Sequence, residues 1–308
     1  MVAVYNGAPG SIDRKAEMVH SASQEGAAQS GRLPQPATYV SNFVTANGLK
    51  LHYLDYGTAG RPIVLCVHGG GGHAHWYDFI ASGLAADYHV ISIDLRGHGE
   101  SDWVDPPAYF YTDYASDLAA FVEQLDLRDF VLIGHSMAGA VVLLYATEYP
   151  GRVQKIILAD STVNLSAERI AAMRDVGTRP GRSYATQGEF VANYRLRPGN
   201  SLAAPEVLRY IARHSGRQFP DGTWKLKFDR SVYGSREMFD GMPLWNQIHI
   251  PALMVRADHS GRITDAVVAN VKARAPQVEV ADVSASDHHL TLDNPAGFVE
   301  AVKPFLAK

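Results

Sequence analysis

The sequence predicts an α/β fold: a mostly parallel central sheet with helices on both faces and an inserted helical cap. Short strand-like runs that are apolar throughout alternate with helix-like segments, which is the pattern of a parallel sheet buried on both sides. The alternation stops near residue 160 and resumes near residue 250. This interruption indicates that an insertion separates two parts of one core.

The first expected element is a hairpin of two strands at 40–45 and 49–56. These strands are joined by Asn47-Gly48, and Asn-Gly is typical of tight hairpin turns. Further strands are expected at 63–67, 89–93, 130–133, 153–159, 251–255 and 278–283. Helices are expected at 76–85, 114–125, 137–149 and 263–274 and from 295 onward.

We expect the chain to have three parts. Residues 1–38 form an N-terminal arm, whose Gly, Ser, Ala and Gln content is typical of flexible segments. Residues 39–160 and 248–308 form the core, and residues 161–247 form the cap. An arm of this kind can pack on a neighbouring subunit, so a homodimer is one expected assembly.

Composition limits the partners of the chain. Its 308 residues carry a formal net charge of -4, which gives no broad attraction to phosphate backbones or anionic lipids. No segment has the roughly 18 consecutive apolar residues of a membrane span. The single cysteine, Cys66, lies in the apolar run 63–67 and excludes an intramolecular disulfide framework. With no signal-like start, we expect a cytoplasmic protein without nucleic acid or membrane partners.

The stretch GHSMAG at 134–139 lies directly between an expected strand and an expected helix. A serine on so tight a turn presents its hydroxyl above the sheet, and the turn requires small neighbours. The helix that follows points its N-terminus at the serine, which favours developing negative charge there. Ser136 is therefore the candidate nucleophile.

This stretch resembles the nucleophile elbow of the α/β-hydrolase family, in its capped, serine esterase-like branch. The family pattern is Gly-x-Ser-x-Gly, and here Ala138 stands at the fifth position with Gly139 after it, which we interpret as a variant. The run HGGGG at 68–72 looks like the oxyanion loop of the family. The resemblance implies that the backbone N–H groups of Gly70 and Met137 form the oxyanion hole.

Two further stretches supply the remaining candidates. DHHLTLDNP at 287–295 resembles the histidine-bearing loop of the family, and its spacing selects His288 as the base, with His289 as the lesser candidate. RADHS at 256–260 resembles the pattern of a branch whose acid comes from an earlier strand end, which here is Asp160. We favour Asp160 as the residue that orients the histidine, with Asp258 as the alternative.

No cofactor or metal is expected. Of the 13 histidines, His68, His73 and His75 lie near the oxyanion loop, but no His-Glu-x-x-His or comparable carboxylate-supported set occurs. The glycine run lacks both the ending of a phosphate-binding P-loop and the glycine spacing of a dinucleotide site.

The sequence thus predicts a carboxylesterase-like enzyme that cleaves a small to medium hydrophobic carboxylic ester through an acyl-enzyme. Lactone, amide or carbamate hydrolysis would use the same residues. A carbon–carbon bond hydrolase would need a basic cap pocket, which Arg195, Arg197 or Arg256 could supply. A cofactor-free lyase or oxygenase would tolerate loss of the serine. A ligand receptor with slow turnover is the alternative from another class.

Overall fold

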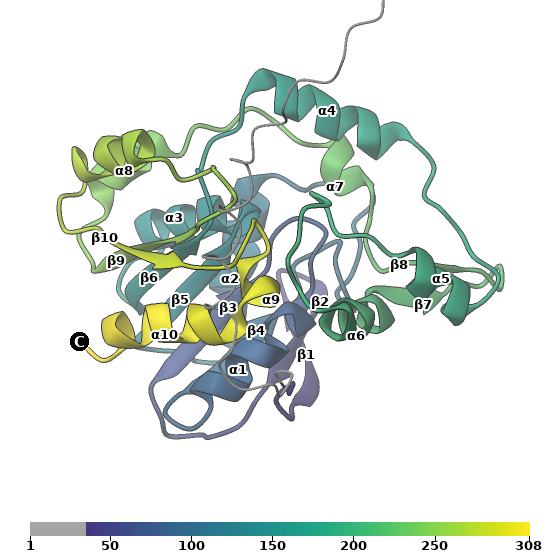
Figure 1. The fold of residues 1–308 in the computed structure, drawn as a ribbon, viewed down its shortest axis with the longest axis horizontal. Helices are drawn as coiled ribbons and strands as arrows, with labels where there is room; N and C mark the ends of the chain where they lie inside the picture. The colour runs from purple at the N-terminus through teal and green to yellow at the C-terminus, as the bar shows by residue number, and fades with distance from the viewer. Residues whose placement is uncertain (1–34) are drawn as a thin grey trace, which may run out of the picture. The chain divides into compact units, whose positions relative to one another are not determined.

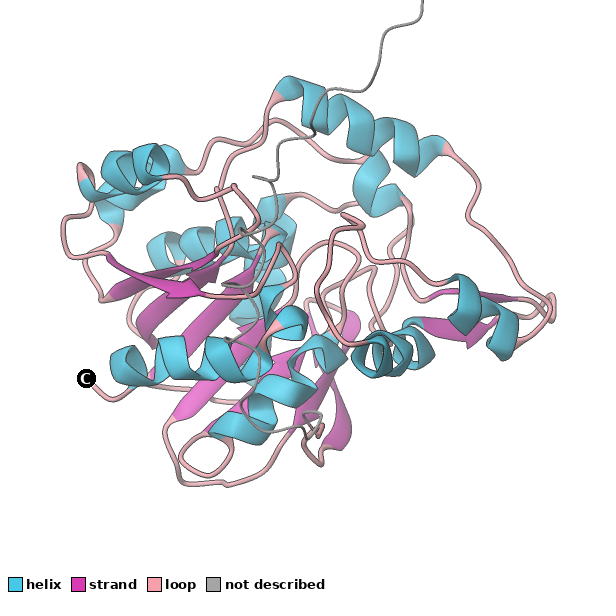
Figure 2. Ribbon diagram, in the orientation of Figure 1, coloured by secondary structure: helices cyan, strands magenta, loops and turns pink. Residues whose placement is uncertain are grey.

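The structure, a computed structural model, describes residues 35–308. In these residues an eight-stranded sheet has the order β1-β2-β4-β3-β5-β6-β9-β10 (Figures 1 and 2). Its strands are β1 (Val40–Ala46), β2 (Leu49–Asp55), β3 (Ile63–Val67), β4 (His89–Ile93), β5 (Phe130–His135), β6 (Val153–Ala159), β9 (Ala252–Ala257) and β10 (Glu279–Val283). Most of the predicted N-terminal arm, residues 1–34, lies outside the described residues.

The strand directions confirm the predicted sheet. The first strand pairs antiparallel with the second, which pairs antiparallel with β4, and all other neighbours in the sheet are parallel. The hairpin turn has Asn47 at φ 50° and Gly48 at φ 73°. Both residues are thus in the left-handed region that a two-residue hairpin turn requires, which explains the Asn-Gly pair.

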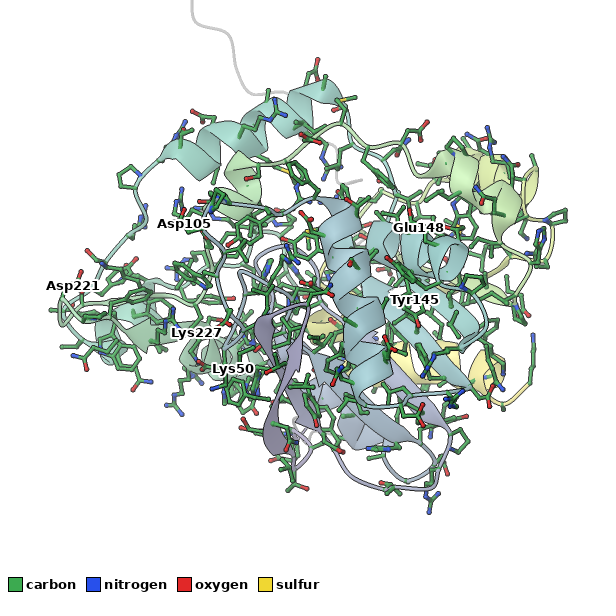
Figure 3. All side chains as sticks on the ribbon, turned by 180° about the vertical axis from the view of Figure 1, so that it is seen from behind. Lys50, Asp105, Tyr145, Glu148, Asp221 and Lys227 are labelled. Atoms are coloured by element: carbon green, nitrogen blue, oxygen red, sulfur yellow. The ribbon has the colours of Figure 1, made fainter. Side chains whose placement is uncertain are left out.

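Helices cover both faces of the sheet. The core helices are η1 (Ala74–Tyr77), α1 (Asp78–Leu84), α2 (Tyr111–Gln124), α3 (Met137–Glu148), α8 (Asp265–Lys272), α9 (Leu290–Asp293) and α10 (Pro295–Leu306). Alternate residues of β5 point to opposite faces: Phe130 and Leu132 pack with α2 and α3, whereas Val131 and Ile133 pack with α1 and α10. Figure 3 views the former face, with Tyr145 of α3 labelled. Burial on both faces explains why this strand is apolar throughout.

The segment between β6 and β9, which we call the insertion, contains seven elements. They are α4 (Ala167–Thr178), α5 (Gln187–Asn193), α6 (Pro205–Ser215), β7 (Gly216–Gln218), β8 (Trp224–Leu226), α7 (Ser231–Gly234) and η2 (Met242–Gln247). The hairpin of β7 and β8 was not predicted from the sequence. Each of its strands has three residues, which is too short for an alternating pattern to be visible.

A buried carboxylate joins the insertion to the core. Asp78, in the first turn of α1, is fully buried and accepts hydrogen bonds from the hydroxyls of Tyr56 and Tyr210. His75 lies 2.9 Å from the same carboxylate. Because Tyr210 belongs to α6, this cluster holds one helix of the insertion against the core. None of the described helices is long and apolar enough to cross a membrane.

Candidate active site

Ser136 stands on a strained turn between β5 and α3. Its backbone has φ 54° and ψ -116°, a conformation that a non-glycine residue rarely adopts. Two hydrogen bonds hold the turn: the N–H of Ser136 donates to the carbonyl of Ala159 at 2.9 Å, and the N–H of Gly139 donates to the carbonyl of Ser136 at 3.1 Å. The pairing of β5 with β6 therefore helps to impose the strained backbone.

The structure explains the departure from the family pattern. A Cβ atom added to Gly134 would lie 2.6 Å from the carbonyl oxygen of Ala138, and one added to Gly139 would lie 2.2 Å from the hydroxyl of Ser161. Both positions must therefore remain glycine. The methyl group of Ala138 is fully buried in the core, so this fold accommodates a side chain at the fifth position of the pattern.

His288 lies against the serine. Its Nε2 is 2.8 Å from the hydroxyl oxygen of Ser136, and its Nδ1 is 2.7 Å from Oδ2 of Asp160. A carboxylate can only accept a hydrogen bond, so Nδ1 carries the proton and Nε2 is left to accept from the serine. This is the geometry in which a neutral imidazole can activate a hydroxyl as a nucleophile.

Asp160 directly follows β6 and is itself fixed from several sides. Its N–H donates to the carbonyl of Val255 at 2.9 Å, and its Oδ1 accepts from the hydroxyl of Ser260 at 2.7 Å. The Nε of Arg262 lies 3.7 Å from its Oδ2. The sequence analysis included Ser260 in the RADHS stretch without giving it a role, and it did not identify Arg262. In the structure both residues hold the carboxylate that faces His288.

The alternative acid, Asp258, lies elsewhere. Its carboxylate accepts hydrogen bonds from the N–H groups of Ala285 and Ser286, at 2.9 and 3.0 Å. These two residues belong to the loop that leads to His288. The structure therefore brings Asp160 to the imidazole and assigns Asp258 to the backbone of the histidine loop.

Burial determines the charge state of the histidine. Desolvation, followed by the guanidinium of Arg262, lowers the pKa of His288 below its ordinary value of 6.5. Burial also raises the pKa of Asp160, while the hydrogen bond from Ser260 opposes that rise. A base whose pKa is lowered remains neutral at pH 7, as acceptance of a proton from Ser136 requires.

The neighbouring histidines have other contacts. The Nε2 of His289 donates to the carbonyl of Pro198 at 2.9 Å, so it fastens a loop of the insertion and does not face the serine. The Nε2 of His135 donates to the carbonyl of His288 at 2.7 Å. His73 contacts the hydroxyl of Ser215 at 2.8 Å. Within residues 35–308, no group of three or more His, Cys, Asp or Glu side chains is placed to hold a metal ion.

The predicted oxyanion residues lie beside the serine. Gly70 and Met137 line the same cavity as Ser136. Met137 is the first residue of α3, so its N–H group has no partner within the helix. The loop passes so closely that a Cβ atom added to Gly69 would lie 3.0 Å from that of Ser136. The hydroxyl of Tyr233 donates to the carbonyl of Gly70 at 3.3 Å.

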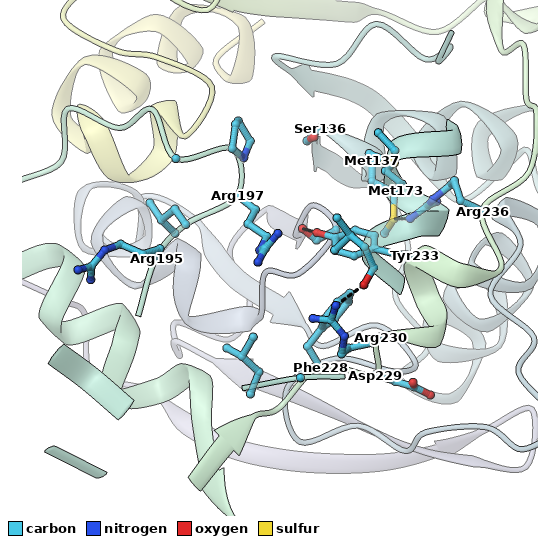
Figure 4. A pocket seen from close by; sticks show the side chains of 18 of the residues that line it. Ser136, Met137, Met173, Arg195, Arg197, Phe228, Asp229, Arg230, Tyr233 and Arg236 are labelled. Atoms are coloured by element: carbon cyan, nitrogen blue, oxygen red, sulfur yellow. Dashed lines mark hydrogen bonds between the residues drawn. The ribbon is translucent and has the colours of Figure 1, made fainter. Parts of the chain in front are cut away.

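These residues open into a cavity of about 1310 Å³ between the core and the insertion (Figure 4). Eight arginines and one lysine line it, against two carboxylates, Asp160 and Asp229. Arg195 and Arg197 belong to this lining. Arg256, the third arginine suggested by the sequence, does not belong to the lining. It binds Asp265 and Asp282 near the carboxyl ends of β9 and β10.

Comparison with known proteins places this geometry in a family. Residues 62–295 match a protein family whose description is alpha/beta hydrolase fold. An esterase of Mycobacterium tuberculosis is 27% identical, over 96% of this chain and 96% of the relative. The 2-(acetamidomethylene)succinate hydrolase of Mesorhizobium japonicum is 24% identical, over 87% of this chain and 95% of the relative. A solved structure of E-2-(acetamidomethylene)succinate hydrolase has the same fold, with a TM-score of 0.76 and 23% identity over 88% of this chain and 100% of that chain.

The different contacts of Asp160 and Asp258 lead to a first prediction. Asp160→Asn should slow the reaction of Ser136 with a fluorophosphonate by roughly 10³- to 10⁴-fold, because the imidazole loses the acceptor that selects its tautomer. Asp258→Asn should change this rate less than about tenfold and should instead lower the thermal midpoint, because an amide has only one acceptor oxygen for the two N–H donors of the histidine loop, so one of them loses its acceptor. Labelling kinetics and thermal unfolding of both variants measure this. The reverse ranking of the two labelling rates would contradict the assignment.

A second prediction concerns pH. The base must be neutral, and a lowered pKa keeps it neutral to lower pH, so the acid limb of the labelling rate should have its midpoint below pH 6.5. Arg262→Gln removes a nearby positive charge, which should raise the pKa of His288 and move the midpoint to higher pH. A pH profile of the labelling rate for both proteins checks this. A wild-type midpoint at or above 6.5 would exclude the proposed environment.

Proposed function

The chain belongs to the α/β-hydrolase family, and from its site we propose that it is a serine hydrolase that cleaves a small to medium carboxylic ester with a hydrophobic portion. One observation carries this proposal: Ser136, His288 and Asp160 form a continuous hydrogen-bonded chain at a cavity large enough for such a substrate. Such a chain is the arrangement that acyl transfer by a serine requires.

In the first half of the proposed reaction, Nε2 of His288 takes the proton of Ser136 while Oγ attacks the ester carbonyl carbon. The electron pair of the carbonyl bond moves to oxygen, and the N–H groups of Gly70 and Met137 hold the oxyanion that forms. The protonated imidazole then gives its proton to the leaving alcohol oxygen. Asp160 remains a carboxylate throughout and stabilises the imidazolium.

In the second half, a water molecule replaces the alcohol. His288 takes a proton from this water as its oxygen attacks the acyl carbon, and the oxyanion forms again at the same two N–H groups. The bond between Oγ and the acyl carbon then breaks, Ser136 regains its proton from the imidazole, and the carboxylic acid leaves.

The insertion supplies the hydrophobic part of the proposed binding site. Its aromatic residues are of two kinds. Phe190, Tyr194, Phe228 and Tyr233 line the cavity, whereas Trp245 is buried in the core and does not line it. An apolar portion of an ester can therefore pack against aromatic rings of the insertion while the carbonyl group lies at Ser136.

A second candidate is hydrolysis of a carbon–carbon or amide bond by the same residues. The observation that favours it is the basic lining, which includes Arg195 and Arg197. Such a lining suits a carboxylate-bearing substrate, and one relative is named a 2-(acetamidomethylene)succinate hydrolase. Product analysis by mass spectrometry after incubation with ring-cleavage compounds or N-acyl amides separates this candidate from ester hydrolysis.

The proposal is tested with p-nitrophenyl esters of increasing chain length, assayed with the wild type beside Ser136→Ala. We expect turnover by the wild type and a loss of roughly 10⁴-fold or more in the variant, because no other group can form the acyl-enzyme. The chain length with the highest kcat/KM then indicates how long an acyl group the cavity accepts.

The contrary result would be folded wild-type protein that reacts with a fluorophosphonate but hydrolyses none of the esters. Such a result would favour the carbon–carbon or amide bond candidate. Turnover far below about 1 per second, together with ligand-dependent capture of a partner protein, would favour the alternative that the chain is a ligand receptor.

A further inference from the structure

An arginine that sequence reasoning did not identify lies beside the reaction centre. Arg236 follows α7 and has 2% of its surface exposed. It lines the cavity together with Ser136 and Met137, and Figure 4 shows its side chain pointing toward Met137. Its carbonyl accepts a hydrogen bond from Nε of Arg174 in α4, so the insertion holds its backbone in place.

The guanidinium of Arg236 has no oxygen partner among the described residues. Its Nε and Nη1 are buried without a hydrogen bond, and its Nη2 lies 2.8 Å from the thioether sulfur of Met137. A thioether is only a weak acceptor. No ion pair of residues 35–308 includes Arg236, and its remaining contact is with the ring face of Tyr111, 5.2 Å away.

Two other arginines of the protein have oxygen acceptors for their guanidinium groups. Arg96, which is also buried, binds both oxygens of Asp117, at 2.5 and 2.6 Å. Arg230, another cavity residue, donates to the carbonyls of Val176 and Arg179. A buried charge without a partner is strongly unfavourable. Unlike these two residues, Arg236 has no oxygen acceptor among the described residues. A bound ligand could provide one.

The charge of the cavity indicates that a ligand of Arg236 would be negatively charged. Although the whole chain is net negative, basic side chains dominate the cavity, and both of its carboxylates are already bonded. Asp160 binds His288, and Asp229 accepts from the hydroxyl of Tyr109 and the N–H of Ser231. A cleft lined mainly by positive charge attracts and concentrates anions.

The position of Arg236 indicates which part of a substrate it meets. A Cβ atom built on Gly70 would lie 3.5 Å from the sulfur of Met137 and 3.8 Å from Nη2 of Arg236. Gly70 and Met137 are the residues whose N–H groups are proposed to hold the ester oxyanion. The guanidinium is therefore adjacent to the carbonyl group of a bound ester.

We propose that Arg236 binds a carboxylate on the acyl part of the substrate, so that the preferred substrates are half-esters of short dicarboxylic acids. This inference rests on the proposed ester hydrolysis. The planar guanidinium can donate two parallel hydrogen bonds to a carboxylate. The unbranched side chain of Met137, which now covers the guanidinium, can change rotamer to admit the carboxylate.

The test compares two esters of nearly the same shape, monoethyl succinate and ethyl levulinate, which differ in carrying a carboxylate or a neutral methyl ketone. Acid release is followed by pH-stat titration. We expect the wild type to have the higher kcat/KM for monoethyl succinate. Arg236→Gln should reduce this preference by about 10- to 100-fold, as expected for loss of a hydrogen-bonded charge pair, and Arg236→Lys should retain part of it.

Arg256→Gln is the matched control, because that arginine is paired with Asp265 and Asp282 outside the cavity, and it should leave the preference unchanged. Thermal unfolding shows whether each variant is folded. Equal losses for both esters in Arg236→Gln would assign Arg236 a structural or oxyanion role and overturn the proposal. A wild-type preference for ethyl levulinate would also overturn it while leaving ester hydrolysis intact.

A binding measurement keeps the inference separate from the proposed function. Ser136→Ala protein is titrated with succinate by calorimetry, with and without Arg236→Gln. Binding that weakens at least tenfold in the double variant supports the carboxylate site even if neither ester is hydrolysed. Equal binding by the two proteins, or no binding by either, overturns it.

Discussion

The hydrogen bond between Nδ1 of His288 and Oδ2 of Asp160 is the interaction on which the site depends. It joins residues 128 positions apart in the chain, and it forms because β6, β9 and β10 are parallel neighbours whose carboxyl ends meet at one edge of the sheet. Parallel α/β sheets carry their sites at this edge for the same reason. The same hydrogen bond fixes the tautomer of the imidazole and holds its unprotonated Nε2 toward Ser136.

Several polar groups hold that interaction in place from the core side. Ser260 donates to the second oxygen of Asp160, and the carboxylate of Asp258 binds the backbone of the loop that carries His288. The two groups act on different partners, yet both follow β9. The residues after β9 therefore orient both Asp160 and the loop of His288. Supporting hydrogen bonds of this kind keep the geometry of a site precise even when its residues lie on loops.

The insertion contributes the environment rather than the reacting groups. Its aromatic rings and arginines line the cavity, and the carboxylate of Asp78 fixes α6 to the core through Tyr210. Charges act more strongly in a site lined by protein than in bulk water. Burial of the unpaired guanidinium of Arg236 is unfavourable in the protein without a ligand. A bound carboxylate would offset this unfavourable free energy.

The sequence by itself determined the sheet, its hairpin and the positions of Ser136 and His288, because each depends on a short contiguous pattern: apolar runs, an Asn-Gly turn, a serine between strand and helix. Only the tertiary structure decided between Asp160 and Asp258, since both follow a strand and only the pairing of β6 with β9 determines which one reaches the imidazole. Arg236 was equally invisible. A single arginine in an unpatterned segment acquires its meaning from burial without a partner, and burial is a property of the folded chain.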